Sequence, residues 1–131
     1  MIEAYEHKKH AFVLQAWLTH WGITIPPVEL FSDIGFIVND VAIGFLFTTN
    51  SGTAYIDHVC ADPRASEMAR DSALDDLLNH LGTVSQSMGY KFLTIITRIQ
   101  ALKDRLSYLG FVPEKEYMLY YKILGGSPCH G

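Results

Sequence analysis

The chain has 131 residues, of which 49% are hydrophobic and 18% charged, a composition that excludes intrinsic disorder and suffices for one buried core. Its net charge of −4 argues against sequence-independent binding to nucleic acid, which depends on Lys and Arg side chains facing phosphates. No apolar run reaches the roughly 18 residues of a membrane helix, and the start lacks the features of a signal peptide. We expect a soluble, cytoplasmic protein with one domain over residues 1–124 and a flexible tail over 125–131.

Apolar residues at helical spacing predict one helix near the N-terminus, after a short strand over residues 2–6. This helix covers His10–Trp21, and Gly22 ends it. Pro26-Pro27 then forces an extended connection, because proline restricts both itself and the residue before it.

Three strands are predicted in the middle of the chain. Residues 34–38 and 41–49 are rich in β-branched and aromatic side chains, and Asn39-Asp40 between them suits a tight turn with positive φ. These two segments therefore predict a hairpin. A third apolar strand covers Thr53–Ala61 and stops at Asp62-Pro63.

The second half of the chain predicts two helices and further strands. Arg70–Met88 carries an apolar stripe at helical spacing, and the nearly all-apolar segment Lys91–Thr97 predicts a strand. Ala101–Leu109 predicts the last helix with Gly110 as its cap, and residues 112–124 predict one long strand or a bent pair. The order β-α-β-β-β-α-β-α-β predicts an α/β (α+β) fold with a mixed sheet and helices on both faces.

This order, with Gly110-Phe111 after the last helix, resembles the GCN5-related N-acetyltransferase (GNAT) superfamily over nearly all of residues 2–124. The resemblance implies a sheet that splays open between Thr53–Ala61 and Lys91–Thr97, with acetyl-CoA in the gap. It also places the pyrophosphate of the cofactor on the N-terminus of the helix from about Arg70. A helix start suits phosphate because it presents unpaired N–H groups and a partial positive charge. A splayed strand leaves backbone groups free to pair with pantetheine.

The loop before this helix departs from the superfamily pattern, which is roughly Val-x-Pro-x-x-Arg/Gln-x-x-Gly-x-Gly/Ala. The chain reads VCADPRASEMARDSAL over Val59–Leu74. Two registers are open, and they put the small-residue places on Ala69 and Asp71 or on Glu67 and Ala69, so neither contains a glycine. Glu67 and Asp71 also bring negative charge to the expected pyrophosphate position. The resemblance implies these cofactor-binding residues: Val59, Cys60, Ala61, Arg64, Ser66, Glu67, Met68, Ala69 and Arg70.

Acetyl transfer to an amine needs a base, because a free alkylamine is mostly protonated at neutral pH. Asp57 and His58 lie in the strand that would hold the acyl group, and either is a candidate base. Adjacent strand residues face opposite sides, so only one of them can face the cleft unless a bulge intervenes. Backbone N–H groups over Val59–Ala61 are the candidate donors to the oxyanion.

The acid that protonates the CoA thiolate would be a tyrosine, and the place of the superfamily's tyrosine is taken by Leu106. Tyr108 lies about 200° around the helix from that position, so it faces away from where Leu106 points. The candidate acids are Tyr108, Tyr117, Tyr120 and Tyr121.

Three aromatic residues have two open interpretations: Trp17, Trp21 and Tyr117 either line the acceptor pocket or pack in the ordinary way. Trp17 and Trp21 lie on the first helix, which forms a substrate wall in the superfamily. We predict no metal site, because Cys129-His130 on a glycine-rich tail supplies too few ligands. Two cysteines far apart in sequence do not suggest a disulfide framework.

These features predict an N-acetyltransferase that transfers an acetyl group from acetyl-CoA to an amine by direct attack, with no covalent enzyme intermediate. The alternative is a non-catalytic GNAT-fold binding or structural module, for example a phage or mobile-element accessory protein that docks on a larger assembly. The glycine-free loop and Leu106 favour that alternative. A diverged enzyme with another donor is a third interpretation. The sequence leaves open a homodimer.

Overall fold

The computed structural model describes residues 1–95, 97, 100–113, 122 and 124. Its elements, in chain order, are β1 Ile2–Ala4, α1 His7–His20, the 3-10 helix η1 Val28–Leu30, β2 Ile34–Val38, β3 Ala42–Phe47, β4 Thr53–Ala61, α2 Glu67–Ser87, β5 Phe92–Ile95 and α3 Gln100–Tyr108. Most of the strand predicted over residues 112–124, and the whole tail, lie outside the described residues.

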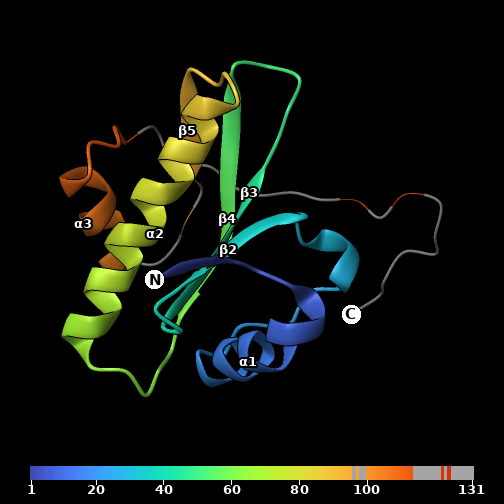
Figure 1. Ribbon diagram of the computed structural model, residues 1–131, viewed down its shortest axis with the longest axis vertical. Helices are drawn as coiled ribbons and strands as arrows, with labels where there is room; N and C mark the ends of the chain where they lie inside the picture. Colours follow the sequence, from blue (N-terminus) through green and yellow to red (C-terminus); the bar gives the residue numbers. More distant parts are fainter. Residues whose placement is uncertain (96, 98–99, 114–121, 123, 125–131) are drawn as a thin grey trace.

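The five strands form one mixed sheet in the order β1-β2-β3-β4-β5. The first four strands are antiparallel to their neighbours, and β5 is parallel to β4. Helices α2 and α3 lie together on one side of the sheet, and α1 lies on the other (Figure 1). The predicted mixed sheet with helices on both faces is therefore confirmed.

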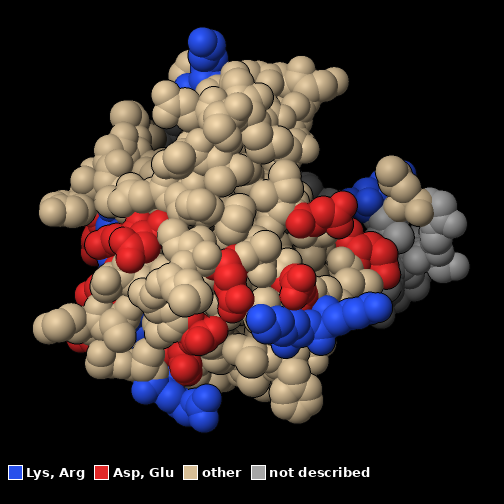
Figure 2. All heavy atoms as spheres, viewed as in Figure 1, with Lys and Arg blue, Asp and Glu red and all other residues tan. Residues whose placement is uncertain are grey.

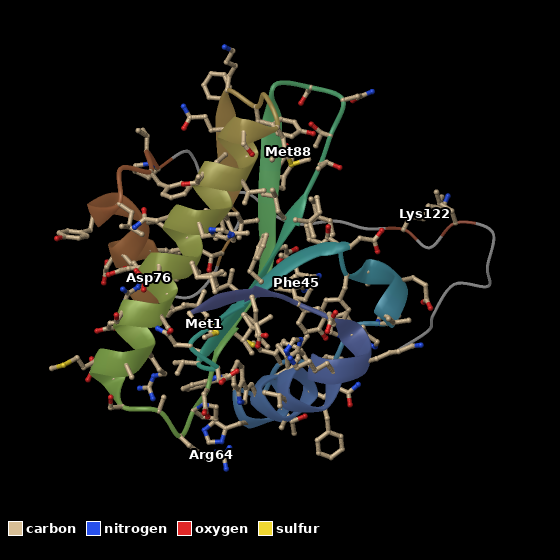
Figure 3. The ribbon with its side chains drawn as sticks, in the orientation of Figure 1. Met1, Phe45, Arg64, Asp76, Met88 and Lys122 are labelled. Carbon is tan, nitrogen blue, oxygen red and sulfur yellow. The ribbon has the colours of Figure 1, made fainter. Side chains whose placement is uncertain are left out.

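Each face of the sheet has its own buried apolar cluster. On one face, Leu77 and Leu81 of α2 and Leu106 of α3 pack against the sheet. On the other face, α1 contributes Leu14, Trp17 and Leu18 to a cluster that includes Phe45. Phe45 lies near the centre of the molecule, where α1 meets the sheet (Figure 3). The helices are held mainly by these apolar stripes, because helix propensity alone stabilises short helices only marginally.

The predicted hairpin turn agrees with the structure, and the starts of two helices lie earlier than predicted. Asn39 and Asp40 have φ of 53° and 54°, as the hairpin turn requires. Helix α1 begins at His7 rather than His10, because the His10 ring bonds back to the first turn: its Nδ1 accepts the Glu6 N–H at 2.9 Å. Helix α2 begins at Glu67 rather than Arg70.

In the part of the chain that the structure describes, no helix is both long enough and apolar enough to cross a bilayer. On the face shown in Figure 2, Lys and Arg side chains are interspersed with Asp and Glu and form no broad basic surface. This mixing agrees with the net charge of −4.

Gly35 provides a sharp test of the packing between β2 and β3. A Cβ built on Gly35 would lie 2.6 Å from Cδ1 and 2.7 Å from Cε1 of the buried Phe45 ring. We expect Gly35→Ala to lower the free energy of unfolding by about 1–3 kcal/mol, because the ring has to shift in a close-packed core. Urea denaturation followed by circular dichroism measures this change.

The matched control is Gly52→Ala, since a Cβ on Gly52 meets no atom within 4 Å. We expect this variant to stay within about 0.5 kcal/mol of the parent chain. Equal effects of the two substitutions would contradict the close approach of Gly35 to Phe45.

The burial of the Cys60 thiol leads us to expect that the stability of the fold depends on pH. Burial raises the pKa of its thiol from the ordinary 9.0 to about 12. Below pH 9 the thiol holds its proton in both states, so its contribution is constant. As the pH rises from 9 toward 12, the unfolded state loses this proton first, and stability falls by up to about 1.4 kcal/mol per pH unit. Urea denaturation at pH 8 and pH 10 measures the slope.

The control for this slope is Cys60→Ala, which removes the thiol and leaves every other titrating group in place. We expect the parent chain to lose more stability than the variant between pH 8 and pH 10. Identical slopes in the two chains would show that the Cys60 thiol ionises alike in both states.

Candidate functional site

Strand β4 is paired on both sides only along its first half. The parallel pairing with β5 runs from Thr53 opposite Phe92 to Ile56 opposite Ile95. From Asp57 to Ala61, β4 continues beside β3 but has no β5 partner among the described residues. The β5-facing edge of this second half therefore carries backbone groups that are available for a ligand. We call this region the β4–β5 wedge.

A β-bulge lies in β4 at the point where the wedge begins. Asp57 is opposite Phe45 and Cys60 is opposite Ile43, so His58 and Val59 together oppose the single residue between Ile43 and Phe45. His58 has φ of 55°, a left-handed conformation that is uncommon for residues other than glycine. The bulge interrupts the alternation of side chains along the strand.

The bulge brings Asp57 and His58 to the same side of the sheet. The Asp57 side chain shares the α1 side with its partner Phe45, and the His58 ring lies 6.2 Å from the Phe45 ring, centroid to centroid. Val59 instead packs against the cluster under α2. Asp57 and His58 can therefore act together, which an unbulged strand would not permit.

His58 is half-buried in an aromatic surround that the sequence did not indicate. Its ring centroid lies 4.8 Å from that of Phe31 and 5.9 Å from that of Phe47. Asp57 is exposed, and its Oδ1 accepts the backbone N–H of His58 at 2.7 Å. This bond helps to hold the unusual backbone of the bulge. No partner is described for the other carboxylate oxygen, so it remains open to solvent or ligand.

The start of α2 presents free amides near the end of β4. The Ser66 hydroxyl caps the helix by accepting the Ala69 N–H at 3.1 Å. The N–H groups of Glu67 and Met68 have no acceptor among the described residues. Both side chains are exposed, Met68 to 82%, so neither closes the loop. These free amides and the partial positive charge of the helix suit an anion.

Asp71 does not oppose an anion at this helix start, contrary to the expectation from the sequence. Its carboxylate accepts a hydrogen bond from Nη2 of Arg105 at 2.5 Å, and Asp75 accepts one from Nη1, also at 2.5 Å. Arg105 comes from α3 and is largely buried. The Asp71 carboxylate is therefore directed toward α3, where it shares the positive charge of Arg105 with Asp75.

The two arginines at the loop differ in their surroundings. Arg64 projects from the loop that leads into α2 (Figure 3), and its Nε lies 3.7 Å from Oδ1 of Asp62. Arg70 is half-buried and points its guanidinium at backbone oxygens of the same loop. Cys60 and Ala61 are buried at the end of β4.

Of the predicted aromatic site residues, the structure brings one to the loop before α2. The Trp21 Nε1–H donates to the carbonyl oxygen of Ala61 at 2.8 Å. Trp17 is only 4% exposed and belongs to the core under α1. Tyr108 is 85% exposed at the end of α3, while Leu106 is buried against α2. Three tyrosines lie outside the described residues: Tyr117, Tyr120 and Tyr121.

Two hollows lie outside the wedge. A cavity of about 50 Å³ beneath α1 is lined by Leu14 and Phe31 among others, and it has room for water but not for a cofactor. An open groove of about 360 Å³ lies between the end of α2 and the start of β5, beside Tyr90. Within the described residues, no cluster of three or more His, Cys, Asp or Glu side chains could hold a metal ion.

No protein-family model and no curated protein sequence matches the chain. Several solved structures do match it. An acetyltransferase of Trypanosoma brucei has a TM-score of 0.69 and 16% identity, over 93% of this chain and 99% of that chain. An aminoglycoside N-acetyltransferase in complex with CoA has a TM-score of 0.65 and 15% identity, over 93% of each chain.

A predicted acetyltransferase from Clostridium acetobutylicum, solved with acetyl-CoA, has a TM-score of 0.64 and 11% identity, over 92% of this chain and 95% of that chain. All three similarities cover nearly the whole chain. The chain therefore has the fold of the GNAT-type acetyltransferases.

Proposed function

We propose that the protein is an N-acetyltransferase that binds acetyl-CoA in the β4–β5 wedge and transfers its acetyl group to an amine. The observation that carries this proposal is the juxtaposition of two features. The edge of β4 from Asp57 to Ala61 has no β5 strand partner among the described residues, and the free amides of Glu67 and Met68 follow it after the loop over residues 62–66. Solved structures of the same fold that hold CoA or acetyl-CoA support it.

Each part of the donor would meet a different part of the site. The amides of Glu67 and Met68 would bind the pyrophosphate, because they are free N–H groups at the positive end of α2. The pantetheine amides would pair with the open edge of β4, as an added strand does. Backbone N–H groups over Val59–Ala61 would donate to the oxyanion that forms on the acetyl carbonyl.

The acceptor would approach from the α1 side, where the bulge places Asp57 and His58. The amine nitrogen attacks the thioester carbonyl, CoA leaves as a thiolate, and the proton of the amine passes to a base. We assign proton removal to His58, whose ring lies beside Phe31 and Phe47. We assign to Asp57 the support of the bulge and the attraction of a cationic amine.

A loop closed by Glu67 or Met68 would favour the alternative of a non-catalytic module, but both side chains are exposed. Asp71 is engaged by Arg105 rather than aimed at the pyrophosphate position. Our proposal retains the expected cytoplasmic, reducing setting, in which Cys60 remains a thiol.

Donor binding is the first test of this function. At 100 times its dissociation constant, CoA should stabilise the chain by about 2.7 kcal/mol and raise the melting temperature by roughly 10 °C. Differential scanning fluorimetry with and without millimolar CoA measures the shift. An unchanged melting temperature would favour the non-catalytic module.

Glu67 offers a matched pair of variants for the helix amides. Glu67→Ala removes the charge and keeps the amide, so it should bind CoA at least as tightly as the parent chain. Glu67→Pro removes the amide as well, and the fold tolerates it because Ser66 is extended, with ψ of 155°, and Glu67 is the first helical residue. Calorimetric titration should show that the proline variant binds CoA about tenfold more weakly than the alanine variant. Equal CoA affinities of the two variants would show that the Glu67 amide does not take part in donor binding.

The two candidate bases can be separated by turnover. The release of CoA thiol from acetyl-CoA is followed colorimetrically with a panel of amines that includes lysine peptides, N-terminal peptides and amino sugars. We expect His58→Ala to lower kcat by about 10²- to 10⁴-fold while CoA affinity is retained. Asp57→Asn keeps an oxygen that accepts the His58 N–H and loses only the charge, so we expect a much smaller loss of kcat.

The reverse order of effects would reassign the base to Asp57. CoA binding without thiol release for any amine of the panel would count against the transferase proposal itself.

A further inference from the structure

The loop between β4 and α2 contains no glycine, and the Arg70 guanidinium holds its backbone. Nη1 of Arg70 donates to the carbonyl oxygen of Ala65 at 2.6 Å and to that of Pro63 at 3.4 Å. The Arg70 side chain thus returns from the first turn of α2 to the loop that precedes it. Arg70 forms no ion pair with a carboxylate among the described residues.

Trp21 also contacts the Arg70 guanidinium. It is the residue that ends α1, and its ring centroid lies 5.8 Å from Cζ of Arg70, within the range of a cation–π contact. Its Nε1–H donates to the Ala61 carbonyl oxygen at 2.8 Å, at the last residue of β4. Trp21 therefore joins the end of α1 to the end of β4 and to Arg70, across 49 residues of sequence.

These contacts fix which way the loop peptides point. The described part of the chain has no cis peptide bond, and in a planar trans peptide the C=O and N–H groups point in opposite directions. Because Arg70 binds the Ala65 carbonyl oxygen, the N–H of Ser66 points away from Arg70. This N–H has no acceptor among the described residues, and it precedes the free amides of Glu67 and Met68. Three successive free N–H groups form a site for an anion.

We propose that Arg70, braced by Trp21, is a positioning residue for the diphosphate of the donor. It turns the carbonyl oxygens of Pro63 and Ala65 away from the ligand and the amides of residues 66–68 toward it. A glycine-free loop thereby keeps one fixed shape. This inference rests on the proposed function, and it names the residue that makes this loop competent for CoA.

The experiment compares CoA with pantetheine, which is CoA without its diphosphate and nucleotide. Arg70→Ala removes the guanidinium, and Arg70→Lys keeps the charge but cannot reproduce the planar contact with two carbonyl oxygens and Trp21. Lys103→Ala, at an exposed position on α3, controls for the loss of one positive charge. Calorimetric titration gives the CoA affinities, and thermal shift at millimolar pantetheine gives the comparison.

We expect Arg70→Ala to bind CoA about tenfold more weakly, which is about 1.4 kcal/mol, and Arg70→Lys to lose most of the same affinity. Pantetheine should shift the melting temperature of both variants as it shifts that of the parent chain. Lys103→Ala should stay within about twofold of the parent chain for CoA.

Three results would overturn the inference while the proposed function stands. Arg70→Ala could bind CoA as the parent chain does, Arg70→Lys could retain full affinity so that only the charge matters, or CoA and pantetheine could weaken equally. A parent chain that does not bind CoA at all would instead overturn the proposed function, and this inference with it.

Discussion

The β-bulge at His58 is the feature on which the candidate site depends. The ladder with β3 holds on both sides of it, at Asp57 and at Cys60, so the extra residue is locked in place. A bulge bends its strand and increases the local twist, and the described pairing with β5 ends one residue before Asp57. A single local irregularity thus turns two polar side chains toward α1 and coincides with the opening of the strand edge.

Two acidic side chains near the start of α2, Asp62 and Asp71, have partners within the protein, which reduces the negative charge that an anion would meet there. Asp62 accepts the N–H of Arg64, and Asp71 accepts a hydrogen bond from Arg105. The N–H groups of Glu67 and Met68 at the start of α2 have no acceptor among the described residues. Local geometry therefore decides the character of this site more than the net charge of −4 does.

Local sequence patterns predicted the elements of the fold. The turn at Asn39-Asp40 and the apolar stripe of α2 are examples, because turn chemistry and periodicity act over a few residues. The start of α2 could also have been predicted, since Ser66 followed by Glu67 is typical of a helix N-terminus. The bulge could not be predicted from the sequence, because it is defined by the alignment of β4 with β3. The contact between Trp21 and Arg70 likewise joins segments that only the tertiary fold brings together.

The separate apolar clusters on the two faces of the sheet have a consequence for how the protein can change. Helix α1 contributes to one cluster, and α2 and α3 contribute to the other. The buried side chains of α1 contact a different cluster from those of α2 and α3, so a change of volume at Leu14 or Leu18 is felt first on the α1 face. Such a change reaches α2 only through the shared sheet or through Trp21, which contacts Arg70. A lineage could therefore vary the packing of one face while it inherits that of the other.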